Sequence, residues 1–170
     1  MPIDWRQAEK ELAGILTRHY GALTDRARAD VSADLGRAVT PDERTLAFIA
    51  DSAASRAKGM AATQRERIAT LRETHSADPD ALRAALAAAE RDATAKAATV
   101  AATETSWAYN SAVAVVVKED GHARLYCTDG DGDPVCAEVN GTYVTPEWAL
   151  ENPTGHPNCT RRFVAEDEGA

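Results

Sequence analysis

The residues best suited to chemistry lie in the last third of the chain, which holds all three cysteines and two of the four histidines. Two of these residues form a His-x-x-Cys pair, a spacing that can present two ligands to one ion from a single tight turn. Thiolates and imidazole suit zinc, and a closed structural zinc site takes four ligands. One interpretation is therefore a zinc site formed by Cys127, Cys136, His156 and Cys159.

Two other interpretations of these residues stay open. Buried thiols often act as small hydrophobic side chains, and a histidine in a turn can cap it by hydrogen bonding. Cys127 and Cys136 lie nine positions apart, which is looser than the Cys-x-x-Cys knuckle of many zinc sites. A disulfide between two of the cysteines is the third interpretation. Three cysteines without a signal-peptide pattern favour reduced thiols or metal ligands over a disulfide framework.

The run Asp129-Gly-Asp-Gly-Asp133 resembles the first half of a calcium-binding loop. That loop requires Gly at its sixth position and Glu at its twelfth, where this chain has Pro134 and Asn140. A tight acidic turn between two strands is the better interpretation. No third group stands in a recognisable place to orient a Cys–His pair, and the sequence has no glycine-rich phosphate loop, so we expect no enzymatic activity.

Composition and charge favour thin helices followed by an acidic module. Hydrophobic residues make up 44% of the chain but aromatic residues only 5%, a balance that suits long Ala-rich helices. Residues 1–124 carry 17 Lys and Arg against 18 Asp and Glu, whereas residues 125–170 carry 2 against 9. The acidic part lacks the basic footprint of a nucleic-acid interface, while DNA contact by the helices stays open. No apolar run reaches the roughly 18–20 residues of a membrane span, so we expect no membrane partner.

Apolar residues at spacings of three and four predict long helices over the first 120 residues. The expected helices cover 2–20, 22–39, 41–75 and 79–119. We expect Gly21 to end the first and Gly121 the last. Thr40-Pro-Asp-Glu43 has the form of a capping box, and Asp78 before a proline marks another helix start. Such Ala-rich helices are marginal alone, so their apolar stripes must pack against other helices.

After Gly121 the pattern changes to short strands separated by turn residues. We expect strands at 122–127, 142–145 and 160–164, and a two-turn helix at 145–152. The predicted fold is mainly α with a small C-terminal α+β module. Its parts are an extended helical region over 1–96, a turn-rich module over 97–165 and an acidic tail over 166–170.

Three segments between residues 97 and 164 follow one another in a recognisable order. They are Thr103-Glu104 with Ala-Tyr-Asn110, Cys136 with Asn140-Gly141, and His156-Pro157-Asn158-Cys159. Together they resemble the helix, the Asn-Gly turn and the His-Pro-Asn-Cys signature of phage minor head proteins, the Mu F-like head-morphogenesis family. The residues that this resemblance marks as structural are Thr103, Glu104, Asn110, Asn140, Gly141, Pro157 and Asn158.

The resemblance implies a structural minor capsid protein of a phage or prophage. Such a protein binds portal protein or major capsid protein and acts in head assembly or genome delivery. It works as an oligomer or in several copies, in the virion or in the host cytoplasm during assembly, and it has no catalytic residues. The alternative function is a metal-binding adaptor domain with helical oligomerisation, unrelated to virions.

The chain departs from the family pattern at three places. Ala102 replaces an arginine, Val139 replaces the second cysteine of a Cys-x-x-Cys pair, and Arg162 replaces a final cysteine. The ligand set that the resemblance implies is therefore incomplete, and Cys127 would have to substitute for the missing thiol.

The His156–Cys159 turn has the residues of a structural lock. Pro157 fixes one backbone angle, and Asn158 tolerates the left-handed conformation that a tight turn needs. We expect this turn to face the turn from Cys136 to Gly141 and to hold the small sheet together.

Overall fold

The computed structural model describes residues 4–40, 43–121 and 123–167. Three long helices form most of it: α1 (Trp5–Asp34), α2 (Glu43–Thr74) and α3 (Pro79–Asp120). The short elements that follow are β1 (Ala123–Thr128), α4 (Pro134–Ala137), β2 (Thr142–Val144), α5 (Pro146–Glu151) and β3 (Arg162–Asp167). The expected fold class, mainly α with a small C-terminal α+β module, is confirmed.

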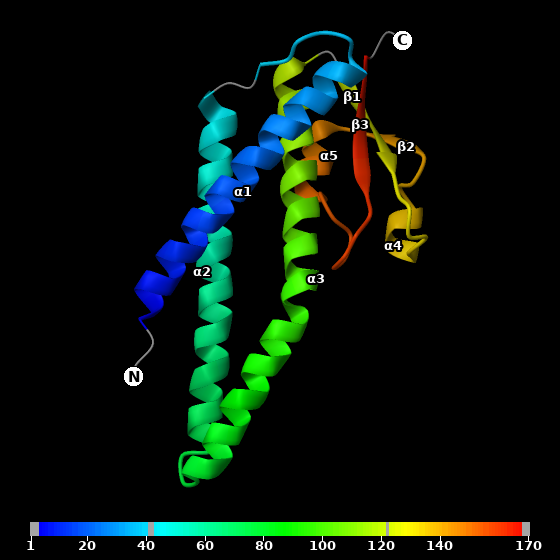
Figure 1. Ribbon diagram of the computed structural model, residues 1–170. Helices are drawn as coiled ribbons and strands as arrows, with labels where there is room; N and C mark the ends of the chain where they lie inside the picture. Colours follow the sequence, from blue (N-terminus) through cyan, green and yellow to red (C-terminus); the bar gives the residue numbers. More distant parts are fainter. Residues whose placement is uncertain (1–3, 41–42, 122, 168–170) are drawn as a thin grey trace.

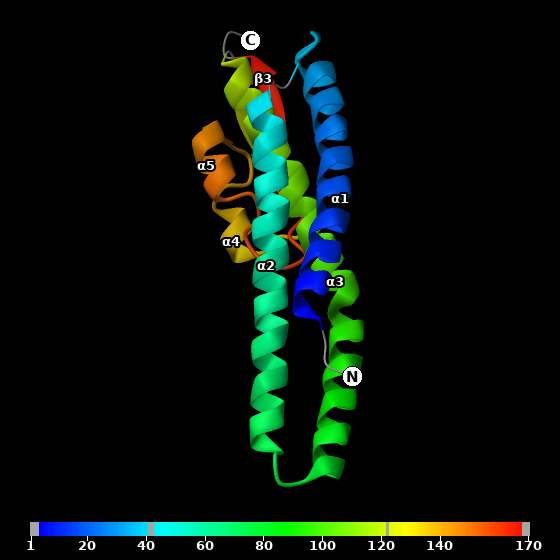
Figure 2. The same ribbon diagram turned by 90° about the vertical axis from the view of Figure 1, so that its left-hand side faces the viewer.

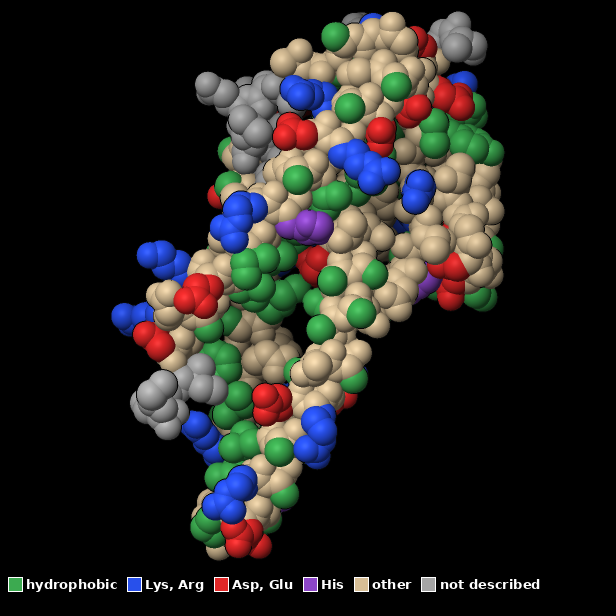
Figure 3. All heavy atoms as spheres, viewed as in Figure 1, with side chains coloured by type: hydrophobic (Ala, Val, Ile, Leu, Met, Phe, Trp, Pro, Cys, Tyr) green, Lys and Arg blue, Asp and Glu red, His purple; other side chains and the backbone are tan. Residues whose placement is uncertain are grey.

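Helices α2 and α3 form a long antiparallel hairpin, and α1 lies against its upper part (Figures 1 and 2). The lower end of the hairpin extends beyond α1 as two helices. Figure 3 shows charges of both signs mixed along α1 and this lower end. The expected boundary between residues 96 and 97 falls inside α3, which continues unbroken from the hairpin tip to the sheet. None of the described helices is long and apolar enough to cross a membrane.

Helix α1 is a single helix where the sequence pattern predicted two. Gly21 lies inside it, and the helix ends at Asp34, just before Gly36 with its φ of 63°. Tyr20 and Thr24 flank Gly21 and are both buried, so one continuous face packs against the other helices. That packing outweighs the roughly 1 kcal/mol that a helical glycine costs relative to alanine.

The two ends of α3 have the expected caps. Asp78 accepts hydrogen bonds from the N–H groups of the first turn of α3, and Gly121 ends that helix in the left-handed conformation with φ 73°. Pro2 and Pro41 lie outside the described residues. The side chain of Glu43 does too, so the capping box before α2 stays a prediction.

The three strands form an antiparallel sheet in the order β2-β1-β3. The face of the sheet that carries Leu125 and Phe163 packs against the C-terminal part of α3, where residues 110–117 are all buried. The last strand, β3, begins and ends two to three residues later than expected. Glu166 and Asp167 therefore belong to this strand and not to a solvated tail. Tyr143 on β2 donates a hydrogen bond of 2.6 Å to the Glu166 carboxylate, so this acid has a partner within the sheet.

A buried carboxylate joins the three long helices. Glu104 on α3 is only 6% exposed; Tyr20 on α1 donates to its Oε2 at 2.5 Å, and the guanidinium of Arg56 on α2 donates to both of its oxygens. That guanidinium also lies 4.3 Å from the centre of the Trp107 ring. Burial and the hydrogen bond to Glu104 raise the pKa of Tyr20 well above its usual range. Ala57, fully buried beside this group, lets α2 approach closely.

We expect Glu104→Gln to destabilise the protein by about 1–3 kcal/mol, because Arg56 loses its counter-charge in a partly buried position. Glu90→Gln, an exposed substitution on the same helix, serves as the matched control and should leave stability almost unchanged. Urea unfolding followed by circular dichroism measures both. Equal unfolding midpoints for the two variants would show that Glu104 is not a structural link.

Candidate metal centre

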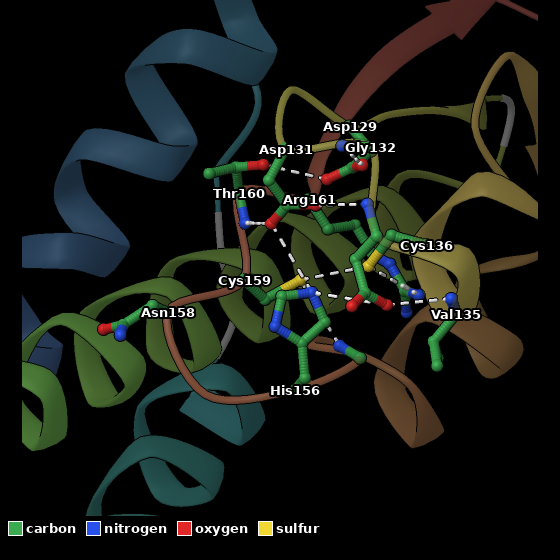
Figure 4. Close-up of polar contacts among 12 residues, drawn as sticks. Asp129, Asp131, Gly132, Val135, Cys136, His156, Asn158, Cys159, Thr160 and Arg161 are labelled. Atoms are coloured by element: carbon green, nitrogen blue, oxygen red, sulfur yellow. Dashed lines mark hydrogen bonds and ion pairs between the residues drawn. The ribbon is translucent and has the colours of Figure 1, made fainter.

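Cys136, His156 and Cys159 lie together at the base of the small sheet (Figure 4). Each offers one potential ligand atom, and these atoms all lie within 4.8 Å of one another. The Sγ atoms of the two cysteines are 3.4 Å apart, and both residues are almost fully buried as free thiols. The expected convergence of the two turns is therefore observed, and the group is suited to hold a metal ion.

The first candidate ligand, Cys136, is placed by a short helix that the sequence pattern did not predict. Asp133 caps α4 by accepting a hydrogen bond of 2.8 Å from Val135 N–H, and Pro134 occupies the first turn. The helix is only one turn long, and it directs the Cys136 thiol into the interior. We had expected this segment to be a plain turn, because four residues are too few for a helical periodicity to show.

The other two candidate ligands, His156 and Cys159, come from the loop between α5 and β3. Cys159 N–H donates to the His156 carbonyl at 3.2 Å, and Asn158 has a φ of 59°, which confirms the expected left-handed conformation. Gly155 N–H donates to the Cys159 sulfur at 3.3 Å. A Cβ atom on Gly155 would lie 2.9 Å from the Cys136 sulfur, so only glycine fits here without a shift.

The His156 ring is held by the backbone on one side and faces the acidic turn on the other. Its Nδ1 lies 2.9 Å from the Pro157 carbonyl, which can only accept, so Nδ1 carries the proton. Its Nε2 is buried without a hydrogen-bond partner among the described residues. Asp131 Oδ2 is 3.4 Å from Nε2 and Asp133 Oδ1 is 3.9 Å away. This tautomer leaves the Nε2 lone pair free for a metal ion.

Arg161 is a buried cation beside the two thiols. It is 4% exposed, donates to the Asn152 carbonyl at 2.8 Å, and points Nη2 at the Cys136 sulfur from 3.4 Å. Trp148 covers the guanidinium, with 5.4 Å between its carbon and the ring centre. Burial and the hydrogen bond with Cys159 raise the pKa of the Cys136 thiol to about 11, although the charge of Arg161 opposes this rise.

The structure does not bring Cys127 into the group of ligands. Alternation along β1 turns Leu125 and Cys127 toward α3, where Cys127 packs in the hydrophobic core. Burial raises the pKa of this thiol. The expectation that Cys127 completes the set of four ligands is thus corrected: Cys127 behaves as a small buried hydrophobic residue, one of the alternatives that the sequence left open.

The acidic run before α4 is a series of turns in which carboxylates accept backbone hydrogen bonds. Asp129 accepts from Gly132 N–H at 3.2 Å, and Asp131 accepts from Asp133 N–H at 3.0 Å. The bond from Asp133 N–H is the main cause that lowers the pKa of Asp131. The arrangement is that of the tight acidic turn expected from the sequence.

The residues that the resemblance marks as structural hold these loops in place. Asn110, 1% exposed, donates through Nδ2 to the carbonyls of Pro153 at 2.7 Å and Arg161 at 2.9 Å. Thr103 Oγ1 accepts from Asn158 N–H at 3.1 Å, which ties the loop to α3.

The Asn-Gly turn fixes the other side of the site. Asn140 Oδ1 accepts from Asp129 N–H at 3.0 Å. Gly141 has a φ of 77° and donates its N–H to the Cys127 carbonyl at 2.8 Å, closing the connection between α4 and β2.

Comparison of the chain with models of protein families, with curated proteins and with solved structures gives no match. The resemblance to phage minor head proteins therefore rests on the quoted residues. Chemically, two buried thiols and one imidazole with a free lone pair can hold a borderline-soft cation such as zinc.

We expect substitutions of two neighbouring buried polar residues on α3 to have very different effects on stability. Asn110→Ala should destabilise the protein by about 2–4 kcal/mol, because it leaves two buried carbonyls without a donor. Ser111→Ala should change stability by less than about 0.5 kcal/mol or stabilise the protein, because Ser111 Oγ has no partner among the described residues. Chemical denaturation of both variants measures this, and similar losses for the two would contradict it.

Proposed function

We propose that this chain is a structural minor capsid or head-morphogenesis protein of a phage or prophage. It binds portal protein or major capsid protein and acts in head assembly or genome delivery, in the virion or in the host cytoplasm during assembly. It has no catalytic activity of its own. The order and spacing of the three signature segments support the proposal.

The observation that carries a structural role is how the chain uses its signature residues. The polar groups of Thr103, Asn110 and Asn140 all bond to backbone atoms of the chain itself, and each bond holds a turn in place. Catalytic side chains are instead arranged around a place where a substrate atom can sit, with a base oriented toward a nucleophile. The signature therefore serves to position loops against α3.

The shape of the molecule suits assembly contacts. The α2–α3 hairpin extends well beyond α1 and the sheet, so a large part of its surface is available to other proteins (Figure 1). Val100, on α3 below the sheet, is 46% exposed. Several copies of such a hairpin can project from a particle while the compact end of each chain keeps its own fold.

The test is co-expression of the chain with the portal protein and the major capsid protein encoded by the same genome. We expect the chain to co-sediment with portal rings or assembled heads in a density gradient, and to be found in purified particles by mass spectrometry. An unrelated helical protein of similar mass, co-expressed with the same partners, controls for non-specific enclosure inside the particles. A chain that stays at the top of the gradient with both partners present would contradict the proposal.

A second candidate function is a metal-binding adaptor domain, favoured by the convergence of Cys136, His156 and Cys159. Zinc bound there would join α4 to the loop before β3. Because such a site does not exist in the unfolded chain, the binding free energy would contribute directly to folding. This function does not require a virion.

We expect the purified protein to contain one zinc per chain and to lose thermal stability in the presence of a strong chelator. Cys159→Ala should abolish zinc binding, whereas Cys127→Ala, the matched control for loss of a buried thiol, should retain it. Elemental analysis and calorimetric melting measure both effects. A parent protein without zinc after growth in zinc-supplemented medium, and with a melt unaffected by chelator, would contradict the metal site.

A further inference from the structure

We infer that Asp131 is the fourth zinc ligand, which closes a site of two thiolates, one imidazole and one carboxylate, and that Arg161 balances its charge. The inference rests on the zinc site proposed above and names the ligand that this site lacks. Asp131 replaces Cys127, which the fold places in the core.

Two of the distances in the group are close to those expected around a tetrahedral ion. A nitrogen and an oxygen bound to zinc at 2.0–2.1 Å lie about 3.4 Å apart, and two sulfurs bound at 2.3 Å lie about 3.8 Å apart. His156 Nε2 and Asp131 Oδ2 are 3.4 Å apart, and the two Sγ atoms are 3.4 Å apart. A disulfide needs about 2.0 Å between its sulfurs, so the observed thiol separation is closer to that of a metal site. Carboxylate oxygens of both Asp131 and Asp129 lie within 4.8 Å of the Cys136 sulfur.

Among the neighbouring acids, Asp131 is the one placed to bind. Asp133 Oδ1 is farther from the ring, at 3.9 Å, and already caps α4 by accepting from Val135 N–H. Asp129 accepts from the Thr160 hydroxyl at 2.8 Å and from Gly132 N–H. Asp131 accepts from Asp133 N–H through Oδ1, whereas its Oδ2 accepts a longer bond, 3.3 Å, from Thr160 N–H and faces the free Nε2 (Figure 4). The hydrogen bonds on Asp131 orient its carboxylate, as outer contacts of zinc ligands generally do.

The charge of Arg161 supplies an independent argument. The residue Arg161 is 4% exposed, and within the described residues its guanidinium makes no ion pair with a carboxylate. A buried cation without a counter-charge is costly. Zinc binding releases the two thiol protons, so Zn²⁺, two thiolates and one carboxylate together carry one negative charge. Arg161, which already donates to the Cys136 sulfur, makes the site neutral.

The experiment is a competitive zinc titration of the full chain against a chromophoric chelator, with the absorption of the cobalt-substituted protein as a second readout. We expect Asp131→Asn to weaken zinc binding at least tenfold and to change the cobalt spectrum, with helicity retained by circular dichroism. Glu138→Gln, which neutralises an exposed acid two positions after Cys136, should bind within about threefold of the parent and keep its spectrum, because an exposed charge contributes little.

The outcomes separate this inference from the zinc proposal. If the parent binds zinc and Asp131→Asn binds it as tightly with an unchanged cobalt spectrum, Asp131 is not a ligand but the three-residue site stands. Equal losses in Asp131→Asn and Glu138→Gln would also overturn the inference, because they would reflect local charge alone. If the parent binds no zinc, both proposals fall.

Discussion

The buried carboxylate of Glu104 is the interaction on which the arrangement of the long helices depends. Tyr20 from α1 and Arg56 from α2 both donate to it, so this one side chain joins α3 to both of its neighbours. The adjacent residue, Thr103, faces another direction and accepts a hydrogen bond from the loop of the candidate metal centre. Successive residues on a helix are about 100° apart, so one dipeptide can serve both sides.

The small sheet cannot be stable without α3. Its strands contain three to six residues, and isolated short strands need a second layer to bury an apolar face. Residues 110–117 of α3 supply that layer and are buried on every side, as a helix that is apolar all round must be. The lower half of the same helix is mostly exposed, so α3 changes from a core helix to a surface helix near Glu104.

Local signals were enough to predict most of the helices. The cap at Asp78, the stop at Gly121 and the apolar spacing between them fixed α3 almost to the residue. Gly21 misled the prediction because a glycine stops a helix only when nothing packs against its neighbours, and here Tyr20 and Thr24 are buried. The acids of β3 misled it because cross-strand partners such as Tyr143 cannot be read from the strand itself.

The candidate metal centre, too, could be predicted from the sequence only in part. The residue types in the two turns were enough to predict that Cys136, His156 and Cys159 lie close together, because proline, asparagine and glycine determine how tight turns run. The direction of Cys127 depends on which face of β1 meets α3, and a strand of six residues with both faces partly buried does not reveal this.

Arg161 shows a further limit of the sequence, because an arginine next to a terminal strand is normally a surface residue. Its burial follows from three contacts of different origin: the Asn152 carbonyl, the Trp148 ring and the Cys136 sulfur. Even the nearest of these partners along the chain is nine positions away. The buried positive charge of Arg161 is stabilised if the two neighbouring thiols become anionic. A bound cation is the usual means of keeping buried thiolates stable. The burial of Arg161 is therefore the structural reason to look for a metal ion in this loop.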